Sequence, residues 1–363
     1  MTDLKIFPGV HDRIHTLLSA YQAWCCSKSW KHQHHTPLLS ASDTGIPVFA
    51  WNDAQGINDS TSPVCIIDHS KENPDAVKTL LTQLNGNKHY IIFDGSRWHE
   101  NKLPTDHSHT VMYWPFLLLD LVQVHTNIES PYFYHQNQYS FEYPKSSLFT
   151  HISGTGRIHR DWFVNNLLPE LKTQNFIFRY RGQDHGCDSS GWDLINQPIG
   201  EGDIPTYFQQ FPDNFAHRVL VRSMSLETYN QSYFALVIET VVDHTDCVFV
   251  TEKTGRCLLS GQPFVVASSP GYLQHLQQMG FKTYGTLWDE SYDSIQDTSL
   301  RMHAVKNLSK ELTLFDWQQH KNQLERIAIH NRMTFLNWQN FVSQLFEDIE
   351  IEVKKFLQTG IKI

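Results

Sequence analysis

Residues 249–292, FVTEKTGRCLLSGQPFVVASSPGYLQHLQQMGFKTYGTLWDESY, decide the fold class of this chain. A short apolar strand gives way to a polar turn and a helix, and a second apolar strand is followed by another helix. Charge is concentrated at the turn, where Glu252 and Lys253 stand side by side. Glu252 can accept hydrogen bonds from ribose or sugar hydroxyls, while Lys253 and the free N–H groups of the helix start can bind phosphate. The stretch therefore predicts an α/β domain that carries half of a nucleotide-sugar site.

A purely structural interpretation of the turn Thr251-Glu252-Lys253 stays open at this point. An acidic residue at a helix start is favoured by the helix dipole, and a neighbouring lysine is usually solvated. The order of strands and helices on both sides of the turn is much harder to obtain by chance. That order favours the functional interpretation.

Several short motifs in the second half of the chain resemble one known family. They are VTEK at 250–253, GQPFVV at 261–266, PG at 270–271, GFKT at 280–283, DESY at 289–292 and an upstream GTGRIHR at 154–160. Together they resemble the carboxy-terminal domain of GT-B-type glycosyltransferases, in a loose group of bacterial, phage and large-virus enzymes. The VTEK turn is similar to that of the α-1,3-fucosyltransferases. The resemblance covers residues 150–340, and residues 1–145 carry no matching motif.

The resemblance implies an α/β fold of two Rossmann-like domains that face a cleft. Residues 1–145 would form the acceptor-side domain and residues 146–340 the nucleotide-sugar-binding domain, with 341–363 as a helix that can cross back to the first domain. The implied activity is metal-independent transfer of a hexosyl or related sugar from a nucleotide-sugar donor to a hydroxyl acceptor. Glycan, lipid-linked, protein and modified-nucleobase acceptors are all compatible with the sequence, as are inversion and retention.

The resemblance also assigns the donor-binding residues. Cationic side chains and helix N–H groups would stabilise the leaving diphosphate in place of a metal ion. Glu252 would bind the nucleotide ribose, and Glu239 would act at the donor sugar as a catalytic residue, although a solvent-facing carboxylate at a strand end is the simpler interpretation of Glu239. The expected donor-binding residues are Arg157, Arg160, Thr251, Glu252 and Lys253.

Candidates for the catalytic base come from the first half of the chain. Apolar strands at 64–68 and 90–95 flank a helix at 73–84, and this β-α-β order predicts a parallel sheet. Ligands bind beyond the carboxyl ends of parallel strands, where Asp68, His69 and Asp94 fall. These residues qualify by position alone as a base that deprotonates the acceptor.

The rest of the chain yields a coarse set of expected elements. A helix is expected at 10–30, a linker between the domains at 127–145 and a long insertion at 182–214. Helix is expected again from residue 309 to the end. Further strands are expected at 110–114, 148–153, 176–180, 232–239 and 247–251, with a helix at 159–171.

Composition agrees with a two-domain cytoplasmic enzyme. The chain has 363 residues, of which 40% are hydrophobic, and a formal net charge of −9 that argues against broad attraction to nucleic acid or anionic lipid. No apolar run is long enough to span a bilayer, and no signal peptide is expected. The six cysteines form no CxxC pair, and the clustered His32, His34 and His35 are interpreted as incidental, so no metal or cofactor is expected.

Two other functions remain as alternatives. The sequence HRDWFVNN at 159–166 matches the spacing of the protein-kinase catalytic loop, with DHG at 184–186 after it, but no glycine-rich loop or strand lysine precedes it. The kinase interpretation is therefore disfavoured, and Asp161 is expected only to start a helix. The second alternative is a catalytically inactive module that binds a nucleotide-sugar or a glycan.

Overall fold

The contacts in the computed structural model divide the protein into two compact units. The first unit is Met1–Phe116 with Asn337–Ile363, and the second is Leu117–Leu336. The predictions for a helix at 10–30, for the three clustered histidines and for most of the insertion lie outside the described residues, as does all of the predicted helix at 341–363 except positions 347 and 351, which are helical. The described residues are 48–50, 54–60, 64–69, 74–84, 88–99, 102–103, 109–113, 115, 118, 139–153, 156–171, 173–180, 183–184, 229–337 and the pair 347 and 351.

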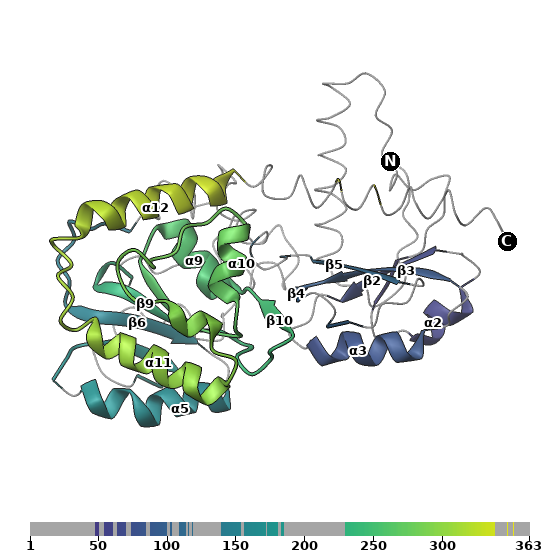
Figure 1. Cartoon of the computed structure of the whole chain (residues 1–363), viewed down its shortest axis with the longest axis horizontal. Helices are drawn as coiled ribbons and strands as arrows, with labels where there is room; N and C mark the ends of the chain where they lie inside the picture. The colour runs from purple at the N-terminus through teal and green to yellow at the C-terminus, as the bar shows by residue number, and fades with distance from the viewer. Residues whose placement is uncertain are drawn as a thin grey trace, which may run out of the picture. The chain divides into compact units, whose positions relative to one another are not determined.

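The first unit contains a parallel sheet of four strands in the order β1-β2-β3-β5. Helix α2 (Ala54–Asp59) joins β1 to β2, helix α3 (Pro74–Gln83) joins β2 to β3, and both helices lie on the same face of the sheet (Figure 1). The parallel β-α-β arrangement predicted for this half is confirmed. The strands are β1 (Val48–Ala50), β2 (Val64–His69), β3 (His89–Asp94), the short β4 (Ser96–Trp98) and β5 (His109–Tyr113).

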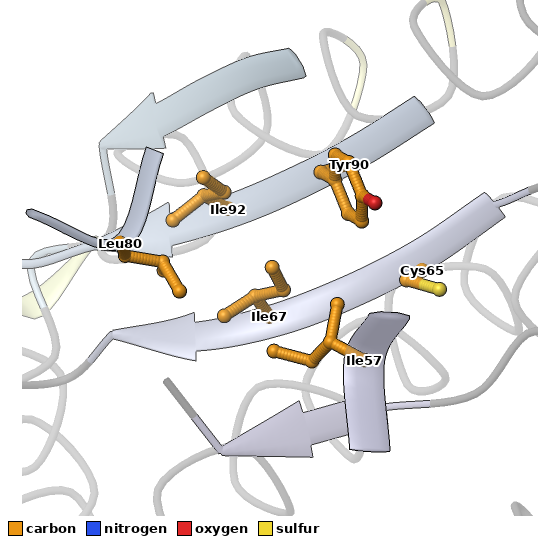
Figure 2. Close-up of a cluster of buried hydrophobic side chains, with 6 residues drawn as sticks. All are labelled: Ile57, Cys65, Ile67, Leu80, Tyr90 and Ile92. Carbon is orange, nitrogen blue, oxygen red and sulfur yellow. The ribbon is translucent and has the colours of Figure 1, made fainter. Parts of the chain in front are cut away.

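Two helices and two strands of the first unit enclose a small hydrophobic core (Figure 2). Alternate residues of a strand point to one face, so β2 and β3 each present two side chains to the helices. Leu81, Leu84 and Val111 pack against the cluster. The six core residues are at most 2% exposed and are Ile57, Cys65, Ile67, Leu80, Tyr90 and Ile92.

The second unit contains a sheet of five strands in the order β11-β9-β6-β7-β8. Neighbouring strands are parallel except β8, which runs antiparallel to β7 at the edge. The central strands β6 and β9 are almost entirely buried, as expected for a parallel sheet covered by helices on both faces. The strands are β6 (Ser147–Ser153), β7 (Ile177–Tyr180), β8 (Gln183–Asp184), β9 (Ser232–Ile238) and β11 (Phe264–Ala267), and β10 (Cys247–Phe249) lies between β9 and β11 in the chain.

Helices cover this sheet on two sides. Helices α5 and α11 lie on one side, and α9 and α12 lie on the other (Figure 1). The helices are α5 (Ile158–Asn166), α9 (Glu252–Ser260), α10 (Tyr272–Gln278), α11 (Thr298–Glu311) and α12 (Lys321–Leu336), with 3-10 turns η2 (Leu168–Leu171) and η4 (Ser291–Ser294).

The strand order creates a switch point between β6 and β9. From β6 the chain passes through α5 to β7 on one side, and it later returns to place β9 on the other side of β6. Connections leave the carboxyl ends of β6 and β9 in opposite directions, which opens a crevice at those ends. Parallel α/β sheets bind their ligands at such a point.

Two predicted helices differ from the structure. Helix α5 ends at Asn166 and is followed by a 3-10 turn, because Pro169 has no N–H group to continue an α-helix. The helical region expected from residue 309 begins earlier, at Thr298, where the carboxylate of Asp297 accepts from the N–H of Leu300 at 2.8 Å.

Part of the predicted linker is bound to the second unit. The N–H of Tyr139 donates to the carbonyl of Ser260 at 2.9 Å, and its hydroxyl donates to the carbonyl of Ser232 at 2.9 Å. The ammonium of Lys145 donates to the carbonyl of Asn230 at 2.8 Å. Residues 139–145 therefore pack on the amino-terminal side of β9, and the domain boundaries at 145 and 340 stay predictions. None of the described helices is long and apolar enough to cross a bilayer.

Candidate functional site

Helix α5 is attached to the carboxyl end of β9 across the switch point. The carbonyl of Ile238 accepts hydrogen bonds from Nε and Nη2 of Arg160, at 3.4 and 3.2 Å. The next carbonyl, that of Glu239, accepts from Nε2 of His159 at 2.9 Å. Burial, together with the charge of Arg160, lowers the pKa of His159 to about 4, so the imidazole is neutral at pH 7 and donates through Nε2.

The side chain of Glu239 is completely buried beneath the N-terminus of α9. Its Oε1 accepts from the hydroxyls of Thr254 and Tyr272, at 2.7 and 2.6 Å, and from the N–H of Thr251 at 3.3 Å. Its Oε2 accepts from the hydroxyl of Thr251 at 2.5 Å. Glu239 therefore does not face solvent, and its carboxylate joins β9 to α9 and α10.

Lys253 lies in the first turn of α9, beside the end of β9. Its ammonium is 3.2 Å from Oε1 of Glu252, 3.2 Å from Oγ1 of Thr251 and 3.5 Å from Oγ1 of Thr240. The Lys253 and Glu252 side chains are 13% and 19% exposed, so both can meet a ligand. Burial alone would raise the pKa of Glu252, but the charges of Lys253 and Arg256 lower it to about 2.

Thr251 has a structural role in this turn. The residue is extended, with φ −109° and ψ 176°, and its Oγ1 accepts from the N–H of Lys253 at 3.2 Å. It is the N-cap of α9 and is fully buried. Thr251 therefore fixes the turn, and Glu252 and Lys253 are the exposed groups of the three.

Arg157 and Arg160 have different environments although they lie on one helix start. Arg160 is 1% exposed and bound to β9, and burial lowers its pKa. Arg157 is the half-buried N-cap of α5, without a side-chain cap. Its backbone is held by Tyr180, whose hydroxyl accepts from the N–H of Arg157 at 2.8 Å and donates to its carbonyl at 3.1 Å. Arg157 is therefore the better placed of the two to reach a ligand.

The N-terminus of α10, which lies at the same edge, is capped by a side chain of the protein itself. The carboxylate of Asp293 accepts from the N–H groups of Leu273 and Gln274, at 2.9 and 3.1 Å. A carboxylate in that position occupies the place of an external anion. An anionic ligand at the switch point would therefore meet α5 and α9.

The first unit holds a second buried polar group at the ends of β2 and β3. Nδ1 of His69 lies 3.1 Å from Oδ1 of Asp94, and both side chains are fully buried. Oδ1 of Asp94 also accepts from the N–H of Ser96 at 3.1 Å, and Oδ2 accepts from the indole N–H of Trp98 at 2.5 Å. Asp94 thus stabilises the turn from β3 to β4. Asp68 lies one position before the end of β2, where it pairs with Phe93, and its side chain lies outside the described atoms.

The predicted residues therefore fall into two groups. The structure gathers six of them at one edge of the sheet in the second unit, and within the first unit Asp94 lies beside His69 at the end of β3. The HRD-type motif lies wholly within α5, a helix, where a kinase would need a loop. The gathered residues are Arg157, Arg160, Glu239, Thr251, Glu252 and Lys253.

The sequence interpretation missed four residues of this site: His159, Thr240, Thr254 and Tyr272. Thr240 directly follows Glu239, and Thr254 directly follows Lys253. A polar side chain next to a predicted site residue could therefore have been predicted as part of the site. Tyr272 follows the PG motif, but its hydroxyl binds Glu239, which lies 33 residues earlier in the chain. No local sequence pattern indicates that contact.

Comparisons with protein-family models, curated proteins and solved structures found no match to this chain. Among the residues that the structure describes, no three metal-ligating side chains converge.

Proposed function

We propose that the protein is a glycosyltransferase that transfers a sugar from a nucleotide-sugar donor to a hydroxyl acceptor. The observation that supports the proposal is that the N-termini of α5 and α9 both bind the end of β9 at Glu239, at the switch point of a parallel sheet. Arg157 is the N-cap of α5, and Lys253 lies in the first turn of α9. Cationic side chains and helix N–H groups together make an anion site at the position where such sheets bind nucleotides. In this proposal the two units form a GT-B-type pair.

Each charged group has a role in the proposed reaction. Cleavage of the sugar–phosphate bond leaves a nucleoside diphosphate with growing negative charge, which Lys253 and Arg157 stabilise. Lys253 then exchanges its contact with Glu252 for one with a phosphate oxygen. Glu252 is ionised at neutral pH and accepts hydrogen bonds from the ribose hydroxyls. These groups supply the counter-charge without a metal ion.

The acceptor reaction needs a base, and Asp68 stays the proposed candidate from the first unit. Asp94 is less suited to this role because its oxygens already accept from His69, Ser96 and Trp98. The acceptor is proposed to be a hydroxyl of a glycan, a lipid-linked sugar, a protein or a modified nucleobase.

A second function, binding of a nucleotide-sugar without turnover, is favoured by a specific observation. Two of the three predicted catalytic carboxylates, Asp94 and Glu239, are fully buried and hydrogen-bonded within the protein. A carboxylate held in this way does not reach a substrate. A binding module would retain the cationic side chains at the end of the sheet but would not catalyse sugar transfer.

Slow hydrolysis of the donor distinguishes the two functions. The protein is incubated with UDP-, GDP-, ADP- and CDP-linked sugars in EDTA, and release of the free sugar is followed by chromatography. A transferase releases sugar from one donor at a rate that falls in Lys253→Ala. A donor that raises the melting temperature without any release identifies a binding module, and the absence of both effects rejects the proposed function.

A further inference from the structure

A chain of hydrogen bonds runs from α10 to the ammonium of Lys253. It starts at the hydroxyl of Tyr272, which lies 2.6 Å from Oε1 of Glu239. It continues from Oε2 of Glu239 to the hydroxyl of Thr251, at 2.5 Å. Oγ1 of Thr251 then accepts from both the N–H and the ammonium of Lys253, each at 3.2 Å. The first three residues of this chain are at most 1% exposed.

The carboxylate at the centre of this chain is held by groups of the protein itself. Three donors reach Oε1, namely the N–H of Thr251 and the hydroxyls of Thr254 and Tyr272, and the hydroxyl of Thr251 reaches Oε2. A carboxylate oxygen offers about two lone-pair sites, so Oε1 is filled and Oε2 keeps one site. Because Glu239 is 0% exposed, a sugar hydroxyl could reach that site only after one of the covering groups moved.

The hydroxyls of Tyr272 and Thr254 also lie close to each other, 2.7 Å apart, and each lies within 2.7 Å of Oε1 of Glu239. Each hydroxyl has one hydrogen. Thr254 donates to the carboxylate, and the shorter of the two contacts of Tyr272, at 2.6 Å, is also with the carboxylate. Loss of either hydroxyl leaves the buried carboxylate with fewer donors, which is costly in a buried position.

We propose that Glu239 and Tyr272 are positioning residues that set the location of the first turn of α9 and, through Thr251, that of the Lys253 ammonium. Neither residue touches the donor. This inference rests on the proposed function for the statement that Lys253 meets a diphosphate. The positioning of the turn itself is a property of the free protein, so it can be measured without any ligand.

The first test is amide hydrogen exchange in the free protein. The amides to follow are those of Thr251, which donates to Glu239, and Gly255, which donates to the carbonyl of Thr251 at 3.1 Å. Tyr272→Phe should speed their exchange by about fivefold to tenfold while α11 and α12 keep their wild-type rates. Wild-type rates at both amides would overturn the proposal, as would faster exchange throughout the second unit.

Matched variants separate the hydroxyl from the bulk of the side chain. Thr254→Val removes the hydroxyl and nearly keeps the shape, whereas Thr254→Ser keeps the hydroxyl. We expect the Val variant to match Tyr272→Phe and the Ser variant to match the wild type. Tyr284→Phe is the control for a lost buried phenol, because Tyr284 lies near the other end of α9, where its hydroxyl is 3.5 Å from the carbonyl of Gln262. Equal exchange in all four variants would overturn the proposal.

The second test uses calorimetry with a nucleoside diphosphate and with the matching nucleotide-sugar. Positioning by Glu239 predicts that Glu239→Gln and Tyr272→Phe weaken both ligands by the same factor, about fivefold to tenfold. A loss confined to the nucleotide-sugar would place Glu239 at the donor sugar and overturn the proposal. If the wild type binds neither ligand, the proposed function fails, and the exchange measurement alone then decides the positioning role.

Discussion

Adjacent opposite charges at one turn are the most informative feature at the scale of single residues. Glu252 and Lys253 are paired with each other in the free protein, and the pairing keeps Glu252 ionised. The same two groups are partly exposed, so a ligand with hydroxyls and phosphate can replace the internal pair with two external ones. If this turn only capped the helix, neither the partial burial of Glu252 and Lys253 nor the contact of Lys253 with Thr240 would be needed.

Replacement of Lys253 tests the cationic turn directly. Lys253→Ala should lower kcat/KM at least about tenfold, because a charge-assisted contact to phosphate contributes about 1.5–3 kcal/mol and more in the transition state. The measurement is donor turnover or, for the binding function, calorimetry with the nucleoside diphosphate. Lys282→Ala, an exposed lysine of the same unit, is the control and should leave both values unchanged. A Lys253→Ala variant with wild-type values would remove the turn from the site.

The buried histidines predict a loss of stability in mild acid. Burial lowers the pKa of His159 to about 4 and that of His151 to about 3, below the ordinary value of about 6.5 in the unfolded chain. Between these values the unfolded state binds more protons, so stability should fall as the pH drops from about 6.5 towards 4. Urea unfolding of the wild type and of His159→Gln at pH 7 and pH 4.5 measures this. The variant should lose less stability over that interval, and equal losses would contradict the assignment.

At the scale of elements, short runs with apolar residues made seven strands predictable. Each of them lies within two residues of its predicted position, and they are β2, β3, β5, β6, β7, β9 and β10. Strand β1 has three residues and α2 six, too few for a period to show, and both were missed. The early start of α11 was readable from Asp297, a typical N-cap.

The end of α9 offers a test of how that element is packed. Gly261 has φ +85°, and a Cβ there would lie 3.0 Å from Cβ of Ala328 on α12. Gly280 has φ +90°, but a Cβ there would lie 3.6 Å from Thr334, an ordinary contact. Gly280→Ala should therefore cost about 1–2 kcal/mol through its backbone alone, and Gly261→Ala should cost more. Thermal unfolding of both variants measures the two losses of stability. Equal losses would show that Ala328 on α12 can move away from the new Cβ without a cost in free energy.

At the scale of the whole molecule, local sequence could not reveal the switch point. The order β11-β9-β6-β7 depends on which strands pair, and no residue near a strand end records that choice. The burial of Glu239 was hidden for the same reason, since its partners lie 12, 15 and 33 residues away in the chain. The charged residues of the candidate site could be predicted from the sequence, because Arg157, Glu252 and Lys253 lie directly at predicted strand-to-helix turns.

The central claim is that the switch point of the second unit binds a nucleoside diphosphate without a metal ion. The most direct measurement is the melting temperature with UDP, GDP, ADP or CDP in the presence of EDTA, for the wild type and for Lys253→Ala. A ligand at one hundred times its dissociation constant stabilises a protein by about 2.7 kcal/mol, so one of the four should raise the melting temperature clearly. The rise should be smaller or absent in Lys253→Ala. No shift with any of the four, or a shift that appears only when a divalent metal replaces EDTA, would contradict the claim.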